Sequence, residues 1–492
     1  MEKSSKHGIT GALSLVESSE SEQKSSKEMD LFIQQCGFFE DESEGQTRER
    51  VLGKLNYLLK KFVQKMSKQK NISNDEKQNF GGKIFTFGSY RLGVHSKGAD
   101  IDVLCVVPKH VTRKDFFSDF YELLSQDYDV KELTKIEEAY VPLIKLVYQG
   151  IPIDLTFARL NMSSVKDNVN LLNDVILKNM DDKCVLSVNG SRVTDEILNL
   201  IPNVKTFHSA LRCIKYWAKR RCIYGNSYGY YGGVAFSISV GRICQLFPNA
   251  SSYTIVSKFF ELYSTWKWPT PVLLKPVIDL SYNMKVWDPK IYPADKYHKM
   301  PVITPAYPSI CSTHNITNST QHLIMDEFAR GHELLSKEKG STNEILQKVC
   351  VLSDFFNRYK LYIQINAISV DGTNFKLWEG FVESKIRILA TKIESLDEVL
   401  YAFPFPRSFE ISKNKIPLFS YKTINVKKCT SFFIGLELPS IKTKKIYIDH
   451  PVKEFIDFIN NYDKKDDNMK LEVCSMKRRD VHNFLSVIYR ND

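Results

Sequence analysis

Residues 85–107 have the sequence FTFGSYRLGVHSKGADIDVLCVV, and they decide the fold class. Two apolar segments, 83–87 and 101–107, are predicted strands, and the residues between them are predicted to form a turn, a short helix and a loop. The turn begins at Gly88 and Ser89, which offer close backbone approach and a hydroxyl group to a phosphate. Such Gly-Ser turns are common, so this turn alone is a weak signal.

Two carboxylates, Asp100 and Asp102, stand at the beginning of the second predicted strand. Side chains alternate between the two faces of a strand, so both carboxylates point the same way while Ile101 points to the other face. Carboxylates this close repel each other, and a hard divalent ion such as Mg2+ would stabilise them. A solvated strand end gives the same pattern and is the alternative interpretation.

A third carboxylate, Asp154, lies in the apolar segment 150–157 (GIPIDLTF). This segment is the second half of a predicted hairpin that turns at Gln149 and Gly150. An unpaired charge inside an apolar strand is costly, so Asp154 requires a salt bridge, an edge position or a functional role. If its strand lies beside the strand of the other two carboxylates, the three converge as a two-metal site requires.

The composition describes an ordinary globular chain of 492 residues, long enough for about two to four domains. The 43% hydrophobic and 25% charged residues exclude a largely disordered chain. A net charge of +11 suits a polyanionic partner without proving one. The 10 cysteines contain no CxxC pair, which favours a reduced protein over a zinc or disulfide scaffold. No apolar run reaches the roughly 18 residues of a membrane span, so we expect no membrane association.

Changes of pattern divide the chain into four parts. Residues 1–28 are rich in Ser, Glu and Lys and are expected to form a flexible tail, within which the less polar stretch 7–14 (HGITGALS) can dock. Residues 29–200 are expected to form a mixed α/β catalytic domain, whose first helices can pack on the next domain. Residues 201–350 follow helical periodicity. Residues 351–492 have the order βαββαβ, which is ferredoxin-like and is the topology of RNA-recognition modules.

The segment 87–102 (FGSYRLGVHSKGADID) resembles the catalytic segment of the eukaryotic poly(A) polymerases, which belong to the polymerase-beta-like nucleotidyltransferase superfamily. The superfamily pattern is Gly-Ser, a spacer, Asp-x-Asp and a later Asp on a neighbouring strand, and all of it is present. Strings such as NGSRVTDEIL (189–198) and YYGGVAF (230–236) extend the resemblance to about residue 400. The chain departs from the family at Ala99, where Ser is frequent, and at 96–97, where Gly-Pro is usual.

The resemblance implies roles for individual residues. Asp100, Asp102 and Asp154 would bind two Mg2+ ions, for which Mn2+ can substitute, and Asp154 would help to deprotonate the 3′-hydroxyl group of the primer. Lys145 and Asn189 would lie near the RNA primer end or the nucleotide. The residues implied at the ATP site are Phe87, Gly88, Ser89, Lys215, Tyr224, Asn226, Gly232, Gly233 and Val234.

Two of these groups can also be interpreted from the residues alone. Arg212, Lys215 and Lys219 form a basic stripe opposite the apolar face of a predicted helix, and a solvated helix face is the alternative. Gly232 and Gly233 precede a predicted buried helix and permit close approach of a planar ligand, although an ordinary helix-start turn would look the same.

The resemblance implies an α+β multidomain protein with a polymerase-beta-like palm, a helical middle domain and a ferredoxin-like, RNA-recognition-like C-terminal domain. The implied activity is that of a template-independent poly(A) polymerase, which adds AMP from ATP to RNA 3′ ends in mRNA polyadenylation and releases pyrophosphate. The implied setting is a nuclear monomer that works with the cleavage and polyadenylation machinery. A uridylyltransferase, a CCA-adding enzyme, an oligoadenylate synthetase and an inactive RNA-binding scaffold are the alternatives, and the intact carboxylates argue against the scaffold.

Overall fold

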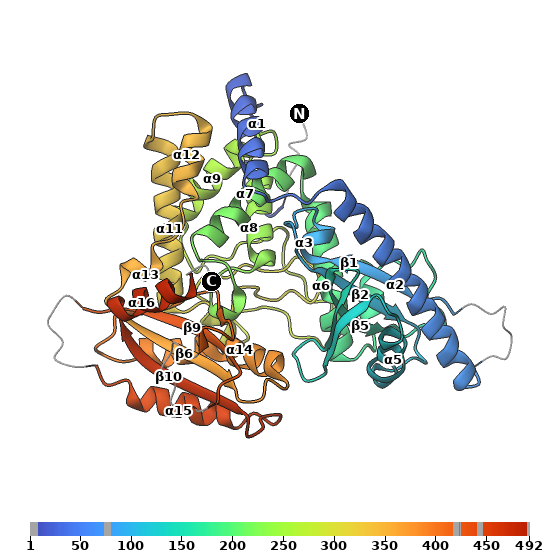
Figure 1. Ribbon diagram of the computed structural model, residues 1–492. Coiled ribbons are helices and arrows are strands. Elements are labelled where there is room, and N and C mark those ends of the chain that lie inside the picture. The colour runs from blue at the N-terminus through green and yellow to red at the C-terminus, as the bar shows by residue number, and fades with distance from the viewer. Residues whose placement is uncertain (1–7, 73–79, 417–422, 424, 440–445, 490–492) are drawn as a thin grey trace.

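The computed structural model describes residues 8–72, 80–416, 423, 425–439 and 446–489 (Figure 1). One sheet is formed by the N-terminal part of the chain and another by the C-terminal part, and they lie on opposite sides of the molecule. Helices from the middle of the chain lie between and above the two sheets. The fold class is therefore α+β with several domains, as the sequence predicts.

The N-terminal sheet has five strands in the order β1-β2-β5-β4-β3. Strands β2 and β5 are parallel, and every other neighbouring pair is antiparallel. The two parallel strands are rich in β-branched and aromatic residues and are mostly buried, as expected of strands in the centre of a covered sheet. The strands are β1 (Lys83–Phe87), β2 (Ile101–Val107), β3 (Val130–Ile136), β4 (Leu143–Tyr148) and β5 (Ile151–Arg159).

The predicted hairpin between β4 and β5 is confirmed. Gln149 and Gly150 both have positive φ angles, 48° and 82°, as a two-residue turn between twisted strands requires. The register of the hairpin pairs Lys145 with Asp154 across the two strands.

The sheet is covered by helices that precede its strands in the sequence and by helices that follow them. Helix α2 begins at a capping box of Asp41 and Glu44 and contributes Leu55, Leu59 and Phe62 to the core of the sheet. The early part of α6 belongs to this core, and its later part belongs to the core of the central helices. The helices are α2 (Glu42–Gln69), α3 (Gly88–Arg91), α4 (Arg113–Asp115), η1 (Phe116–Phe120), α5 (Tyr121–Ser125), η2 (Asp174–Leu177) and α6 (Asp182–Leu200).

The central unit is helical, and α8 is buried over most of its length, as its nearly continuous apolar sequence predicts. The expected boundary at residue 200 falls between α6 and α7, and the one at 350 falls between α12 and α13. The helices are α1 (Glu20–Gln35), α7 (Val204–Arg220), η3 (Asn226–Tyr228), α8 (Gly233–Leu246), α9 (Ser252–Ser264), α10 (Pro293–Lys296), α11 (Asn318–Lys337), α12 (Thr342–Val349) and α13 (Phe355–Arg358).

The N-terminal segment differs from the expectation of a flexible tail over residues 1–28. Residues 1–7 lie outside the described residues, but from Gly8 onward the segment is bonded to the central helices. The N–H group of Leu13 donates to the carbonyl of Leu246 (2.8 Å), and the carbonyl of Leu15 accepts from the central unit. Helix α1 then packs against α7, α9 and α12. The composition is polar because one side of this segment faces water, while the other side is docked.

The C-terminal sheet has the strand order β10-β6-β9-β7, with β8 also paired to β9, and all neighbours are antiparallel. The predicted order βαββαβ is confirmed in β6, α14, β7, β9, α15 and β10, and the structure adds the short strand β8 and helix α16. The elements are β6 (Leu361–Ser369), α14 (Phe375–Glu394), β7 (Tyr401–Pro404), β8 (Phe409–Ile411), β9 (Lys428–Glu437), α15 (Asp449–Asn460), β10 (Met469–Lys477) and α16 (Arg478–Ile488).

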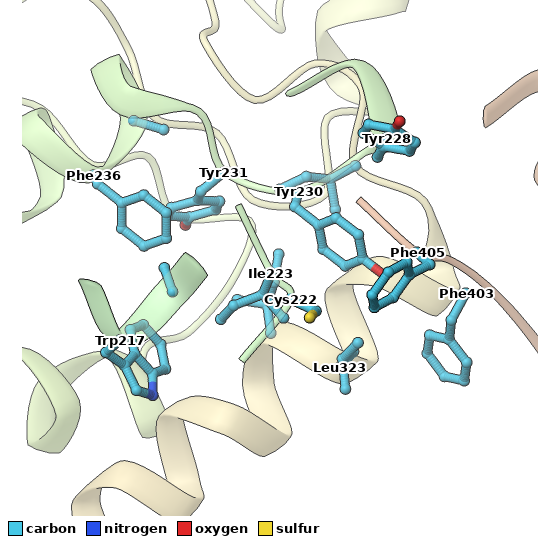
Figure 2. Packing of buried hydrophobic residues seen from close by; sticks show 14 of the residues in the cluster. Trp217, Cys222, Ile223, Tyr228, Tyr230, Tyr231, Phe236, Leu323, Phe403 and Phe405 are labelled. Atoms are coloured by element: carbon cyan, nitrogen blue, oxygen red, sulfur yellow. The ribbon is translucent and has the colours of Figure 1, made fainter. Parts of the chain in front are cut away.

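The central helices and the C-terminal sheet share one hydrophobic core. Figure 2 shows Tyr230 reaching from the central unit to Phe405, which follows strand β7. The hydroxyl group of Tyr230 donates to the carbonyl of Pro404 (2.8 Å), so the buried polar atom is satisfied across the boundary. These two units are therefore joined by packing as well as by the chain. Within the described part of the chain, every helix is too short or too polar to cross a bilayer.

Trp217 on α7 is the centre of an aromatic cluster in this core. Its side chain is 0% exposed and meets the ring of Phe260 edge-on, with the centroids 4.7 Å apart. We expect Trp217→Ala to lower the free energy of unfolding by about 3–5 kcal/mol, because it leaves a large cavity. The measurement is the thermal unfolding midpoint. Tyr297→Ala, at a position that is 80% exposed, is the control and should leave that midpoint unchanged. Equal midpoints for the two variants would contradict the prediction.

Candidate active site

The sheet brings the three predicted carboxylates together. Asp102 on β2 is paired with Phe87 on β1 and, through the parallel ladder, with Asp154 on β5. Carboxylate oxygens of Asp100, Asp102 and Asp154 lie within 4.8 Å of one another. The strand of Asp154 therefore lies beside β2, which contains Asp102 and directly follows Asp100, and this was the condition for a site.

The electrostatics of this cluster follow from burial and from like charges. Burial, and then the charges of Asp100 and Asp154, raise the pKa of Asp102 to about 7. Burial also raises the pKa of Asp154, although the ammonium group of Lys145 lies 3.0 Å from its Oδ2 atom and opposes this effect. A set of oxygen donors that repel one another in this way fits a hard divalent cation, and the site is therefore suited to divalent metal use.

Gly88 is the residue that lets β1 approach this cluster. Its φ angle is +63°, and a Cβ atom at this position would lie 2.2 Å from Oδ2 of Asp102. No other residue fits without moving the carboxylate, because both the backbone conformation and the space exclude a side chain. The N–H group of Gly88 donates to Oγ1 of Thr194 on α6 (3.2 Å), and the ring of Phe87 packs against Gly190 on the same helix. Ser89 follows directly in the first turn of α3.

Two of the three residues of the basic stripe on α7 bind the protein rather than water. Lys215 is 4% exposed, and its Nζ atom donates to the carbonyl of Val94 (2.9 Å), in the loop before Asp100. Burial, and then the charge of Lys219, lower the pKa of Lys215 to about 7. Arg212 donates to the neighbouring carbonyl of Gly93 (2.5 Å). Lys215 and Arg212 are therefore bound to the loop before Asp100, and the solvated alternative is wrong for these two residues, whereas Lys219 is exposed.

The residues expected at the adenine form a second cluster beside the carboxylates. Burial, and then the charges of Asp100 and Asp102, raise the pKa of Tyr224 to about 12. The ring of Tyr224 lies parallel to that of Phe236, with centroids 5.8 Å apart, and Nζ of Lys219 lies 5.6 Å from its centroid.

The glycines before α8 are needed where they stand. A Cβ atom on Gly233 would lie 2.9 Å from the hydroxyl oxygen of Tyr224, and one on Gly232 would lie 3.3 Å from Cβ of Asn226. The Oδ1 atom of Asn226 is buried and has no hydrogen-bond partner among the described residues. Val234 is 38% exposed at the beginning of α8. The turn therefore packs tightly around two predicted site residues, Tyr224 and Asn226.

The two residues expected near the RNA lie in different surroundings. Lys145 is half-exposed and paired with Asp154, inside the carboxylate cluster. Asn189 is buried on α6, and its Nδ2 atom donates to the carbonyl of Pro308 (3.3 Å), a contact with the central unit rather than with the carboxylates. Its Oδ1 atom finds no partner in the described part of the chain.

Two residues that support the site were missed by the sequence analysis. Thr194 accepts from the N–H group of Gly88, and the Nδ2 atom of Asn315 donates to the carbonyl of Asn226 (3.1 Å). Thr194 lies one helical turn after Gly190, so periodicity places the two on one face of α6. Which strand that face meets depends on the tertiary fold, and no local pattern marks Asn315.

Carboxylates on two parallel neighbouring strands, beside a Gly-Ser turn that follows a third strand, define a nucleotidyltransferase. Three family models match the chain in order: the poly(A) polymerase nucleotidyltransferase domain at 8–201, the poly(A) polymerase central domain at 206–356, and the poly(A) polymerase predicted RNA binding domain at 354–417 and 420–489.

Proteins of similar sequence agree with these models. Poly(A) polymerase PAPa of Candida albicans is 47% identical over 409 residues, which cover 82% of this chain and 73% of that protein. Poly(A) polymerase of Dictyostelium discoideum is 40% identical over 490 residues, which cover 97% of this chain and 59% of that protein. The chain belongs to the poly(A) polymerase family, and it is an enzyme that adds adenylate to polynucleotides without a template.

Solved structures show a more distant likeness. A structure of Cid1, described as having RNA terminal uridylyl transferase activity, is 16% identical with a TM-score of 0.45, and the match covers 66% of this chain and 98% of that one. This similarity is too low to indicate which nucleotide the chain uses.

Gly88→Ala tests the close approach of β1 to the carboxylates. We expect adenylate addition to fall by about 100-fold or more, because the new methyl group displaces Asp102 from its place in the cluster. Gly150→Ala is the matched control, because Gly150 also has a positive φ angle but has nothing within 4 Å of the position of a Cβ atom. Both variants carry the same kind of backbone strain, so only the first should lose activity. Equal losses in primer extension would contradict the prediction.

Proposed function

We propose that the chain adds AMP from ATP to the 3′ end of RNA with two Mg2+ ions held by Asp100, Asp102 and Asp154, and that Mn2+ can substitute. The observation that carries the proposal is the convergence of three carboxylates within 4.8 Å beside Gly88. Divalent ions bound there would polarise the 3′-hydroxyl group and neutralise charge on the triphosphate and on the leaving oxygen.

The residues of the chain would move one proton in this reaction. The 3′-oxygen of the RNA forms a bond to the α-phosphorus of ATP, and the bond from that phosphorus to the bridging oxygen of pyrophosphate breaks. Asp154 takes the proton of the 3′-hydroxyl group at a carboxylate oxygen and passes it to solvent. Burial raises the pKa of Asp154, which makes it a stronger base than an exposed carboxylate. Lys145 stabilises its anionic form from 3.0 Å away.

ATP would bind between the sheet and the central helices. Phe87, Gly88 and Ser89 line the triphosphate side, and Lys215 supplies a positive charge there. Burial lowers the pKa of Lys215 to about 7, and an arriving anion would raise this pKa again, because opposite charge stabilises the ammonium form. On the adenine side we place Tyr224, Asn226, Gly232, Gly233 and Val234.

The RNA end and the cellular setting are part of the same proposal. Lys145 contacts the primer end through the exposed part of its side chain. Asn189 on α6 offers its unpartnered Oδ1 atom as a hydrogen-bond acceptor near the primer end. The C-terminal sheet widens the RNA-binding surface. Membership of the family supports a monomer in the nucleus that works with the cleavage and polyadenylation machinery in mRNA polyadenylation.

Primer extension tests the activity and the carboxylate site together. Purified protein is incubated with a labelled oligo(A) primer, Mg2+ and each nucleoside triphosphate separately, beside Asp102→Ala. We expect a ladder with ATP alone, and none with the variant, because one ligand of the metal site is lost. A ladder with UTP or CTP would overturn the adenine assignment. A variant as active as the wild type would overturn the carboxylate site.

The same variant should separate metal binding from folding. In metal-free buffer the unfolding midpoint of Asp102→Ala should equal or exceed that of the wild type, because one of three repelling carboxylates is gone. Adding Mg2+ should raise the midpoint of the wild type only, since a ligand stabilises the state that binds it. Equal rises in both proteins would place the metal elsewhere.

Lys215→Ala should weaken the use of ATP more than the use of RNA. We expect KM for ATP to rise about tenfold or more, because a charge-assisted hydrogen bond to the triphosphate is lost. KM for the primer should stay unchanged. Lys205→Ala, at an exposed position on the same helix, is the control for a lost charge and should change neither constant. A rise in KM for RNA alone would assign the α7 stripe to the RNA backbone.

A further inference from the structure

The three carboxylates are not held in place equally well. Asp102 and Asp154 are paired with each other in the ladder of β2 and β5, and Asp102 is also paired with β1. Asp100 precedes the first residue of β2, has no partner in any ladder of the described sheet, and is exposed. The sheet therefore fixes two of the three ligands, and the position of the third depends on the loop that ends in Ala99.

Arg48 holds the main chain next to Asp100. Its Nη2 atom donates to the carbonyl of Ala99 (2.7 Å), which belongs to the peptide group that leads into Asp100. Arg48 lies on α2 and is only 3% exposed, so a long cationic side chain has been buried to reach this carbonyl. Its guanidinium group also lies 6.0 Å from the ring centroid of Tyr90, at the other end of the same loop.

A carboxylate holds Arg48 in this orientation. Oε2 of Glu40 accepts from Nε of Arg48 (2.7 Å), and Oε1 of Glu40 lies 2.8 Å from Nε2 of His95. Burial raises the pKa of Glu40, but the hydrogen bonds from His95 and Arg48 outweigh burial and hold the pKa below its usual range. Glu40 is therefore an anion at neutral pH, and it ties α2 to the loop at a second point.

One main-chain hydrogen bond of the loop leads to the same anchor. The N–H group of Lys97 donates to the carbonyl of Phe38 (2.9 Å), in the connection between α1 and α2. The segment 38–48 thus contacts the loop at residues 95, 97 and 99, and Asp100 follows directly after the last of these. If Arg48 only stabilised α2, it would not need to donate a hydrogen bond to the carbonyl of Ala99, next to Asp100.

We propose that Arg48 is a positioning residue for metal binding: held by Glu40, it fixes the Ala99–Asp100 peptide and so aims the carboxylate of Asp100 into the cluster. This inference rests on the proposed role of Asp100 as a metal ligand. Residues that orient a metal ligand typically contribute about 10–100-fold to metal affinity or activity.

The test measures Mn2+ binding directly, by the electron paramagnetic resonance signal of the free ion, in the wild type, Arg48→Met, Arg48→Lys and Glu40→Gln. We expect Arg48→Met to weaken Mn2+ binding about 10–100-fold. Arg48→Lys should weaken it less, because Lys keeps the positive charge but lacks the several N–H donors of the planar guanidinium group. Arg50→Met is the matched control. Arg50 is exposed on the same helix, and among the described residues its one hydrogen bond is to Thr47, so Mn2+ affinity should not change. Wild-type affinity in folded Arg48→Met would overturn the inference.

A double variant separates positioning from a general loss of structure. If Arg48 acts through Asp100, then Arg48→Met should have no further effect on Mn2+ affinity in the Asp100→Asn background. An additional loss equal to that in the wild-type background would overturn the inference. Steady-state kinetics should show a lower kcat for Arg48→Met with KM for ATP unchanged, which a loosened fold would not give.

The design also keeps this inference apart from the proposed function. If Asp100→Asn binds Mn2+ as the wild type does, the proposed metal role of the carboxylates fails. If Asp100→Asn loses affinity and Arg48→Met does not, only the inference fails. Circular dichroism and unfolding midpoints in metal-free buffer identify variants that do not fold. In that event Arg48→Lys and Glu40→Gln carry the test, and wild-type affinity in both would overturn it.

Discussion

The parallel pairing of β2 with β5 is the constraint on which the rest of the site depends. Its register places Asp102 beside Asp154, so the fold brings two like charges together in a partly buried position. A sheet can impose this only because many apolar side chains along both strands are buried at the same time, and their burial outweighs the repulsion. The surroundings of the pair then follow: a glycine where β1 comes close, and a lysine opposite Asp154.

The central helices complete the site rather than cover it. Helix α6 contributes to the core of the N-terminal sheet and to that of the central unit, and α7 places Lys215 and Arg212 against the loop before Asp100. The same central core continues into the C-terminal sheet through Tyr230. The carboxylates, the basic groups and the RNA-binding-like domain are consequently linked by continuous packing.

Local pattern was sufficient for the elements and for the carboxylates. The turn at Gln149 and Gly150 and the βαββαβ order follow from strand periodicity and turn chemistry. Asp100 lies just before β2, so periodicity alone does not fix the direction of its side chain. Contacts between distant segments could not be predicted in this way. The less polar stretch 7–14 indicates that the N-terminal segment can dock, but it does not indicate that the partner is α8. The charge of Lys215 suggests water where the fold provides a carbonyl. No sequence pattern distinguishes Arg48 from the other charged residues of α2.

The loop before Asp100 is held by its main chain. Arg212, Lys215 and Arg48 all donate to carbonyl oxygens, at residues 93, 94 and 99. Every amino acid supplies a carbonyl, so substitutions among the acceptor residues leave these bonds available, whereas substitution of any donor removes one. The departures from the family pattern at Ala99 and at 96–97 fall within this tolerant stretch. The sequence of the loop is therefore a poor guide to its importance, because the side chains that hold it lie on α2 and α7.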